Sequence, residues 1–557
     1  MSRDQEIARS VTPRPIDEIA ASLGLAPEEL HLYGSEVAKI DLSVLDGPRR
    51  RPGEGRLVLV SAITPTPAGE GKTTTGIGLA QALARIGESA CLALREPSLG
   101  PALGMKGGAT GGGRSQVIPM DRINLHFTGD FHAISTANNL LAAALDNHLH
   151  QGNSLGIDPR RVLWRRALDM NDRALRQIVA GLGGRSHGVP RETGFDITAA
   201  SEVMAMLCLA EGFEDLRARL DRTLVASTFD REPVLAEQLG VTGAMLALLR
   251  DALRPNLVQT LEGTPALIHG GPFANIAHGC SSVIATRMSL ALADWTITEA
   301  GFGFDLGGEK FFDIKCAGAG LEPSAVVLVA TLRALKMHGG LALSELEAPD
   351  AGAVLRGLPN LEKHVENVRA FGMEPIVALN AFASDTPDET DVVRDFCQRA
   401  GLAFATSEHH SRGGAGSEDL ARVLVEATPA DKSRFAPLYA RDLPAREKIL
   451  EVARTIYGAR DVAFTRQAEQ DLRALEKLGY GDLPVCIAKI PGSLSDDPTL
   501  RGRPRDFEIT VREIRVNAGA GFLVVLTGDI MRMPGLPRKP RAEQIDVDAK
   551  GEISGLE

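Results

Sequence analysis

The chain has few aromatic residues, few cysteines and no excess of positive charge. Tryptophan occurs twice and tyrosine four times in 557 residues. The six cysteines lie far apart and form no CxxC or other metal-ligand spacing, which argues against a disulfide framework or a zinc site. The formal net charge of −11 argues against nucleic acid as the main partner, because binding to a phosphate backbone needs a basic field.

Long apolar runs are missing as well. The first ten residues are polar and charged, so they do not resemble a signal peptide, and no run of about 18 apolar residues predicts a membrane span. Hydrophobic residues make up 44% and charged residues 24%, which suits a chain that buries a large core. We therefore expect a cytoplasmic protein with reduced thiols and no membrane partner.

Alternating strand and helix patterns predict an α/β fold. Residues 57–63 form an apolar, β-branched run of the kind that is buried on both faces of a parallel sheet. A glycine-rich turn, an amphipathic helix and a second apolar run at 90–94 follow, which together make a βαβ unit. Further buried strands are expected at 325–330, 375–380 and 521–527. These patterns predict a doubly wound, mostly parallel sheet.

A phosphate-binding loop is predicted between the first strand and its helix. The sequence there is Thr66-Pro67-Ala68-Gly69-Glu70-Gly71-Lys72-Thr73. Gly69 and Gly71 let backbone N–H groups turn toward phosphate oxygens, and the helix N-terminus adds a positive dipole end. Lys72 supplies a mobile cation for the phosphates, and the Thr73 hydroxyl is placed to bind Mg²⁺. Thr66 replaces the usual first glycine, and a glycine-rich turn without a special role is the alternative.

The length favours several domains, at roughly 100–200 residues per domain. We expect a large P-loop nucleotide-binding domain over residues 1–360 and two smaller α/β domains over 361–474 and 475–557. A shift to small and acidic residues around 340–355 motivates the first boundary.

A second anion-binding element is predicted at the end of the next strand, where Arg95 and Glu96 follow the run at 90–94. Because the carboxyl ends of neighbouring parallel strands face one crevice, Arg95 should point toward the bound phosphates. Its guanidinium can hold a carboxylate or a phosphoryl group through two hydrogen bonds. A surface ion pair is the alternative. A glycine-rich run at 106–114 follows.

A series of motifs in this chain resembles that of the formate–tetrahydrofolate ligases, in the same order and over nearly the whole length. The motifs are TPTPAGEGKTTT, REPSLGP, MKGGATGGG, INLHFTGDFHAI, LDMNDRALR, GFDITAASEVMA, GGPFANIAHG, EAGFGFDLGGEKFFDIKC and AGAGFLVVLTGDIMRMPGLP. Several are longer than ten residues, so chance similarity is not credible. The resemblance implies a large nucleotide-binding α/β domain, two smaller domains and a homotetramer.

The resemblance also implies a two-step ligation. Formate attacks the γ-phosphate of ATP to give formyl phosphate and ADP, and tetrahydrofolate then takes the formyl group to give 10-formyltetrahydrofolate and phosphate. Lys72 and Mg²⁺ would neutralise the ATP phosphates, while Arg95 would hold formate and then formyl phosphate. The implied partners are ATP with Mg²⁺, formate, tetrahydrofolate with or without a polyglutamate tail, and a monovalent cation, K⁺ or NH₄⁺.

Other residues gain roles by the same resemblance. Thr73 and Glu96 are expected near the metal. Backbone around Gly307 falls where the family builds part of the formyl phosphate pocket, and a supporting glycine-rich turn is the alternative. Phe382 matches a phenylalanine that stacks on the pterin, and the 361–474 domain would thereby contribute the folate site.

Three histidines lie inside family motifs, namely His126, His132 and His278. For each of them, a buried and hydrogen-bonded structural role is the alternative to a catalytic one, and we favour the structural role.

Some positions depart from the family pattern. His410 stands where a tryptophan usually completes the pterin site, so we expect weaker and pH-sensitive folate binding. Phe304 replaces an alanine, and its bulk is expected to narrow the formyl phosphate pocket or reshape the folate entrance. Cys280 replaces an asparagine, and residues 489–493 replace the sequence KTQYS. A P-loop ligase or kinase with another acid or acceptor is therefore an alternative, as is a non-catalytic nucleotide-binding protein.

Overall fold

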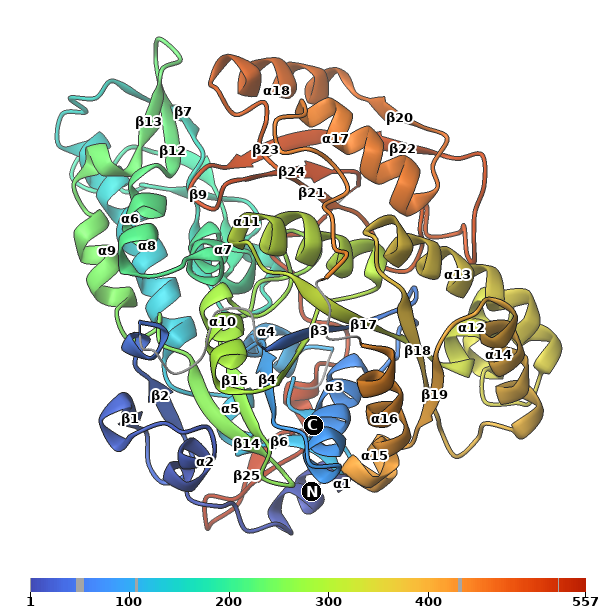
Figure 1. Cartoon of the computed structure of the whole chain (residues 1–557). Coiled ribbons are helices and arrows are strands. Elements are labelled where there is room, and N and C mark those ends of the chain that lie inside the picture. The colour runs from blue at the N-terminus through green and yellow to red at the C-terminus, as the bar shows by residue number, and fades with distance from the viewer. Residues whose placement is uncertain (1, 47–54, 106–108, 429–432, 529, 557) are drawn as a thin grey trace.

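The computed structural model describes residues 2–46, 55–105, 109–428, 433–528 and 530–556 (Figure 1). Part of the glycine-rich run singled out above, residues 106–108, lies outside the described residues.

A 12-stranded sheet forms the centre of the molecule (Figure 1). Its parallel part contains, in spatial order, β15 (Pro265–Ile268), β4 (Ala90–Leu94), β16 (Trp295–Glu299), β3 (Arg56–Ala62), β17 (Pro323–Ala330), β18 (Pro375–Asn380) and β19 (Phe404–Ser407). Its antiparallel edge contains β14 (Asn256–Thr260), β2 (Ala38–Ile40), β1 (Leu30–Leu32), β6 (Ser115–Ile118) and β5 (Gly111–Gly112). The prediction of an α/β fold with a large, mostly parallel sheet is therefore confirmed.

Strand β3 shows why this part of the sheet needs cover on both sides. Its side chains alternate between the two faces, and those of Leu57 and Leu59 join one hydrophobic core while those of Val58 and Val60 join another. All four are fully buried. Helices α3 (Lys72–Arg85) and α16 (Glu418–Ala427) pack in the second core, whereas α12 (Leu332–His338) and α13 (Ala351–Ala370) pack in the first.

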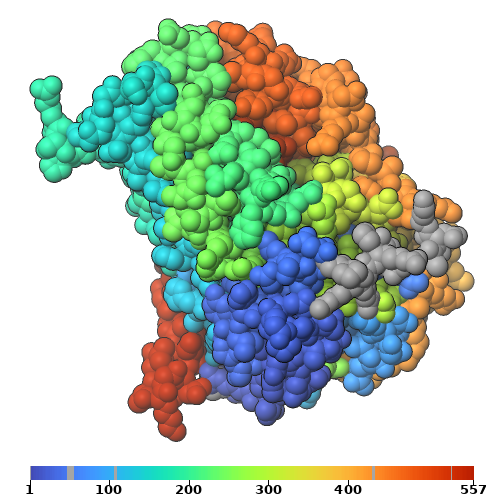
Figure 2. All heavy atoms as spheres, turned by 60° about the vertical axis from the view of Figure 1, so that its left-hand side comes forward, coloured from blue at the N-terminus to red at the C-terminus, as the bar shows by residue number. Residues whose placement is uncertain are grey.

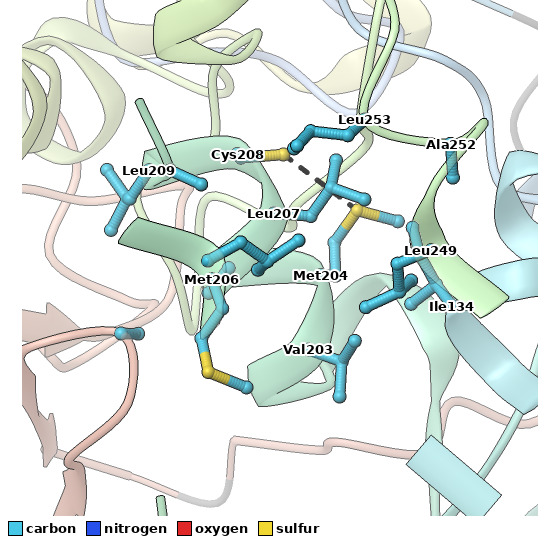
Figure 3. Close-up of a cluster of buried hydrophobic side chains, with 14 of the residues drawn as sticks. Ile134, Val203, Met204, Met206, Leu207, Cys208, Leu209, Leu249, Ala252 and Leu253 are labelled. Carbon is cyan, nitrogen blue, oxygen red and sulfur yellow. Dashed lines mark hydrogen bonds between the residues drawn. The ribbon is translucent and has the colours of Figure 1, made fainter. Parts of the chain in front are cut away.

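A separate helical core covers the part of the sheet that contains β2, β14, β15 and β4. Helix α7 (Glu202–Leu209) is buried all round and lies among α6 (Asp130–His150), α9 (Thr242–Leu249) and α10 (Val283–Leu292). Figure 3 shows Met204, Leu207 and Cys208 of this helix among neighbouring leucines. A helix that is apolar on every side is stable only inside such a packed region.

The C-terminal part of the chain forms small sheets of its own. Strand β20 (Asp461–Phe464) pairs with β22 (Glu508–Val511), and β21 (Val485–Ala488), β24 (Phe522–Leu526) and β23 (Glu513–Asn517) form another sheet. Helices α17 (Ala445–Val452) and α18 (Arg466–Lys477) accompany them. A fully buried salt bridge between Lys489 and Asp305, 2.7 Å long, ties this part to the central sheet region.

The expected boundary between residues 360 and 361 falls inside α13, which continues without a break to residue 370. Strands β18 and β19, which follow that boundary, are hydrogen-bonded into the large sheet through β17. The division into three units therefore stays a prediction about folding units and does not coincide with a break in the sheet.

Peripheral elements include an arm formed by β9 (Ile178–Ala180) and β10 (Arg191–Thr193), which projects from the body and is teal in Figure 2. The arm and its neighbourhood expose Leu163, Val179 and Leu182. The two ends of the chain lie together, because the Ser2 hydroxyl donates to the carbonyl of Leu556. Among the residues that the structure describes, none of the helices combines the length and hydropathy that crossing a bilayer requires.

The other elements are α1 (Arg3–Arg9), α2 (Ile16–Ser22), α4 (Leu99–Leu103), α5 (Met120–Asn124), α8 (Phe213–Asp221), α11 (Ala317–Ala319), α14 (Pro387–Arg399), α15 (His409–Arg412), β7 (Ile157–Val162), β8 (Arg166–Leu168), β11 (Phe195–Ile197), β12 (Leu224–Thr228), β13 (Pro233–Leu235), β25 (Asp546–Val547) and β26 (Ile553–Ser554).

Candidate functional site

The predicted phosphate loop connects β3 to α3, which begins at Lys72. Both glycines adopt the left-handed backbone conformation, with φ of +83° at Gly69 and +71° at Gly71. A Cβ at Gly71 would also lie only 2.6 Å from the amide nitrogen of Asn380. Pro67 and Ala68 are exposed together with Gly69 at the tip of the loop. Gly71 has no side chain that could cap α3, so the helix begins without a side-chain cap.

Glu70 fixes the loop to the sheet instead of facing outward. Its buried carboxylate accepts hydrogen bonds from the backbone N–H of Thr66, at 2.7 Å, and from the hydroxyl of Thr331. The Glu70 carbonyl accepts from the side-chain amide of Asn380 at 3.1 Å. Burial raises the pKa of Glu70, and its hydrogen bonds and Lys72 oppose that rise. Thr331 follows β17 and Asn380 ends β18, so the next two strands of the sheet on one side of β3 hold the loop in shape.

Glu299 joins the phosphate loop to Arg95. The Thr73 hydroxyl donates to Oε2 of Glu299 at 2.6 Å, and Oε1 of Glu299 lies 3.6 Å from Nη2 of Arg95. Glu299 is only 3% exposed and is the last residue of β16, which lies between β3 and β4. A carboxylate on the strand beside a phosphate loop, bonded to the loop hydroxyl, is the usual arrangement for holding Mg²⁺ on a nucleotide. Sequence reasoning missed Glu299, although its place at the end of an apolar run before a glycine-rich turn was a usable signal.

Arg95 is held from a second side by the backbone. Its Nη1 donates to the carbonyl of Pro272 at 3.2 Å. A Cβ at Gly301 would lie 3.2 Å from Nη1 and 3.4 Å from Nη2, so this glycine leaves room for the guanidinium. Gly307 packs against Gly301, since a Cβ at Gly307 would clash with the Gly301 carbonyl. The Gly307 N–H donates to the Gly303 carbonyl at 2.9 Å. Gly301 therefore leaves space beside Arg95, and Gly307 packs against Gly301.

Glu96 is buried and forms no hydrogen bond with Thr73, although both residues belong to the described part of the chain. It is 5% exposed, and its pKa lies well above the usual range because of burial and because of the negative charge of Asp130. Asp130 itself forms a buried salt bridge with Lys39 at 2.8 Å. Glu299 is therefore the carboxylate that the structure places beside Thr73. Mg²⁺ on a nucleotide needs few protein ligands, all of them oxygens, so Thr73 and Glu299 fit it better than Glu96 does.

The two expected pterin residues have different surroundings. Phe382 follows β18, and the guanidinium of Arg333 stacks on its ring at 4.4 Å from the centroid. His410 is exposed, and its carbonyl accepts from the N–H of Arg114 at 2.9 Å, next to the tight turn between β5 and β6. No ring contact joins Phe382 and His410 in the described part of the chain.

The adjacent His409 is buried, and it anchors this turn to the sheet and to α3. Its Nδ1 lies 2.9 Å from the hydroxyl of Ser407, and burial lowers its pKa to about 3.

The histidines in the family motifs do not behave as expected. His126 and His132 are exposed, so the favoured interpretation of a buried structural histidine is wrong for both. His278 is fully buried, but neither ring nitrogen has a hydrogen-bond partner among the described residues. Burial lowers the pKa of His278 to about 3, and the charges of Lys315 and Arg95 add to the effect, so the ring is neutral.

The expectation for Phe304 is wrong. Its ring is fully buried and packs against Phe312 and Phe371, with centroid distances of 5.6 and 6.0 Å. A ring inside the core cannot line a solvent-accessible entrance or narrow the space around Arg95. The replaced segment at 489–493 is structural as well, because Lys489 pairs with Asp305 beside that ring. Cys280 is buried and free.

Fold and site together define a class: an α/β enzyme whose polar residues gather at the carboxyl ends of neighbouring parallel strands, where such sheets bind ligands. The family model described as formate–tetrahydrofolate ligase matches residues 2–557. The chain therefore belongs to the formate–tetrahydrofolate ligase family, whose members use ATP to join formate to tetrahydrofolate.

Proposed function

We propose that this ligation takes place at the carboxyl ends of β3, β4 and β16, with residues 66–73 holding ATP. The observation that carries the proposal is the position of Glu299, which accepts a hydrogen bond from Thr73 and pairs with Arg95, the residue that follows the neighbouring strand β4. The buried carboxylate of Glu299 thus contacts both the Thr73 hydroxyl, which we assign to the metal, and the Arg95 guanidinium, which we assign to formate.

In the first step, an oxygen of formate attacks the γ-phosphorus of ATP, and the bond to the β–γ bridging oxygen breaks to release ADP. Lys72 and Arg95 would place cations on the two sides of the transferring group, which offsets the repulsion between the two anions. Thr73 and Glu299 would hold Mg²⁺, which supplies charge neutralisation on the β and γ phosphates when bound. Glu299 would also keep Arg95 oriented toward the formate site.

In the second step, N10 of tetrahydrofolate attacks the carbon of formyl phosphate, and the bond to the phosphate oxygen breaks. We assign Phe382 to the pterin; the guanidinium of Arg333 stacks on one face of this ring. His410 stays our prediction for the opposite face, because its exposed side chain in α15 lies beside the β5–β6 turn.

Three further assignments stay proposals. A homotetramer is supported by the exposed apolar residues of the β9–β10 arm, since such residues commonly mark protein contacts. K⁺ or NH₄⁺ is proposed as an activator without an assigned site. A cytoplasmic location is proposed from the cysteine pattern, which has no paired spacing.

The buried position of Phe304 removes one reason to suspect another acceptor. The Thr73–Glu299–Arg95 arrangement also argues against a non-catalytic nucleotide-binding protein, because it keeps a cation where the reacting group would lie.

A direct test incubates the protein with Mg-ATP and formate, with and without tetrahydrofolate, and measures both ADP and the acid-generated methenyl-folate absorbance. Folate-dependent ADP release matched by formyl-folate is the expected result. ADP release that depends on formate but yields no formyl-folate at saturating folate would point to another acceptor and refute the proposal.

A further inference from the structure

A cationic pocket of about 360 Å³ lies between α13 and the C-terminal sheets, away from the residues assigned to catalysis. Its wall contains Lys363 from α13 and Tyr457, Arg460, Arg503, Arg505 and Asp506 from the C-terminal part. Four of these side chains are cations and one is an acid. None of these residues takes part in the reaction proposed above.

Two of the arginines are held in place by glutamates at the rim. The pairs are Arg503 with Glu362 and Glu366, and Arg460 with Glu508, at 2.7 to 2.9 Å. These glutamate side chains are about half exposed, between 44% and 52%, so solvent screens the pairs strongly. Arg505 forms no salt bridge with any residue that the structure describes, and its charge is available to a ligand.

Lys363 is the buried cation of the pocket, with a side chain only 7% exposed. Its ammonium donates to the Asn367 side chain at 2.5 Å and to the Thr455 carbonyl at 2.6 Å, both of them neutral acceptors. The nearest carboxylate, that of Glu366, is 3.9 Å away. Burial lowers the pKa of Lys363 to about 8, with Glu366 opposing the shift and Arg503 adding to it. An ammonium has three donors, so a ligand oxygen would meet an unfilled donor on a desolvated cation.

Hydrogen bonds connect the pocket wall to the end of β3. The side-chain amide of Asn360 donates to the Thr64 hydroxyl at 3.0 Å and to the Gly502 carbonyl at 2.8 Å. His338 lies between the same two partners, with Nε2 at 2.8 Å from the Thr64 carbonyl and Nδ1 at 3.2 Å from the Gly502 N–H. Segment 502–506 of the pocket is thereby fixed to the residues that lead into the predicted phosphate loop.

Helix α12 relates the pocket to the proposed pterin site. His338 ends this helix beside Gly502, and Arg333, stacked on Phe382, lies near its beginning. Five residues of α-helix span about 7–8 Å, so one short helix separates the pterin-binding ring from the segment that carries the pocket arginines.

We infer that this pocket binds a small polyanion, a molecule that presents several carboxylate or phosphate oxygens. The best-placed source is the glutamyl end of the folate substrate, which carries its carboxylates at the end remote from the pterin; this choice of source rests on the proposed folate site. Inorganic phosphate and phosphorylated effectors present the same chemistry and are the other source.

Binding is measured by titration calorimetry on the full chain, with γ-linked triglutamate and inorganic phosphate as separate probes. The main variant is Arg505→Gln, which removes a cation without breaking a salt bridge. Arg501→Gln is the matched control, since Arg501 lies exposed on the same segment but outside the pocket wall. We expect the wild type to bind one or both probes, Arg505→Gln to weaken binding about threefold to fivefold, and Arg501→Gln to leave it unchanged. Lys363→Gln is expected to weaken binding about tenfold, with circular dichroism as the check on folding.

The outcomes separate the two sources. Two results together support the folate end. Triglutamate binding depends on Arg505, and in Arg505→Gln the ratio of the KM values for monoglutamyl and triglutamyl tetrahydrofolate falls toward one. Phosphate binding that depends on Arg505, with an unchanged KM ratio, supports the free anion. Absence of binding by either probe, or equal affinities for Arg505→Gln and Arg501→Gln, overturns the inference. The titrations need no turnover, so a failure of the ligase assay would count only against the proposed function.

Discussion

Replacing Glu299 by glutamine tests the centre of the proposed site. The substitution keeps the size of the side chain but removes the charge that Thr73 and Arg95 share, at 2.6 and 3.6 Å. A hydrogen bond to a charged group contributes about 1.5–3 kcal/mol, and each 1.36 kcal/mol corresponds to a factor of ten in rate. If Glu299 acts on the transition state, kcat/KM should fall about 10- to 150-fold for both Mg-ATP and formate.

The assay is steady-state formyl-folate formation, with Mg-ATP and formate varied separately. Glu88→Gln is the control, because Glu88 accepts a hydrogen bond from Trp295 at the opposite end of β16, at 2.9 Å. It makes the same chemical change on a carboxylate that contacts the same strand, and it should leave both constants unchanged. A Glu299→Gln enzyme with wild-type kcat/KM for both substrates would refute the role of this carboxylate, and a loss confined to Mg-ATP would refute its link to Arg95.

The other predictions concern Arg95, His410 and Glu202. Arg95→Lys should lower kcat/KM for formate about 10- to 100-fold with little change in the KM for ATP, because an ammonium cannot make two parallel hydrogen bonds; an equal loss for both substrates would contradict the assignment. His410→Trp should tighten tetrahydrofolate binding, and unchanged binding in a fluorescence titration would show that residue 410 does not stack on the pterin. Burial raises the pKa of Glu202 from 4.5 to about 7, so the folded protein binds a proton more tightly than the unfolded chain and loses stability as the pH rises through this interval. Relative to Glu202→Gln, the wild type should lose on the order of 3 kcal/mol of unfolding free energy between pH 4.5 and 7 in urea titrations, and parallel pH curves would contradict the prediction.

Much of the central βαβ unit could be predicted because its signals are local. The strand at 57–63 is apolar at every position except Ser61 because both faces of β3 are covered. The two left-handed glycines mark the loop, and Lys72 begins the helix as the spacing requires. The position of Arg95, after β4, was predictable in the same way, because parallel strands of one sheet point their carboxyl ends to one edge.

Other features depend on residues that are far apart in the chain. Glu299 contacts Thr73 across 226 residues, and only the strand order β4–β16–β3 brings them together. The burial of Phe304 was not predicted for a related reason. Its ring packs in a cluster with Phe312 and Phe371, which the local sequence does not indicate.

The sequence by itself determined the α/β class, the loop between β3 and α3 and the family to which the chain belongs. Side-chain periodicity, turn chemistry and extended motifs are properties of neighbouring residues, and they persist before any strand has paired. Only the tertiary structure decided which carboxylate accompanies the loop, which glycine makes room for Arg95 and where the pocket around Lys363 lies. Those contacts depend on which strands become neighbours in the sheet and which faces the helices bury, and these choices are settled by packing the whole chain.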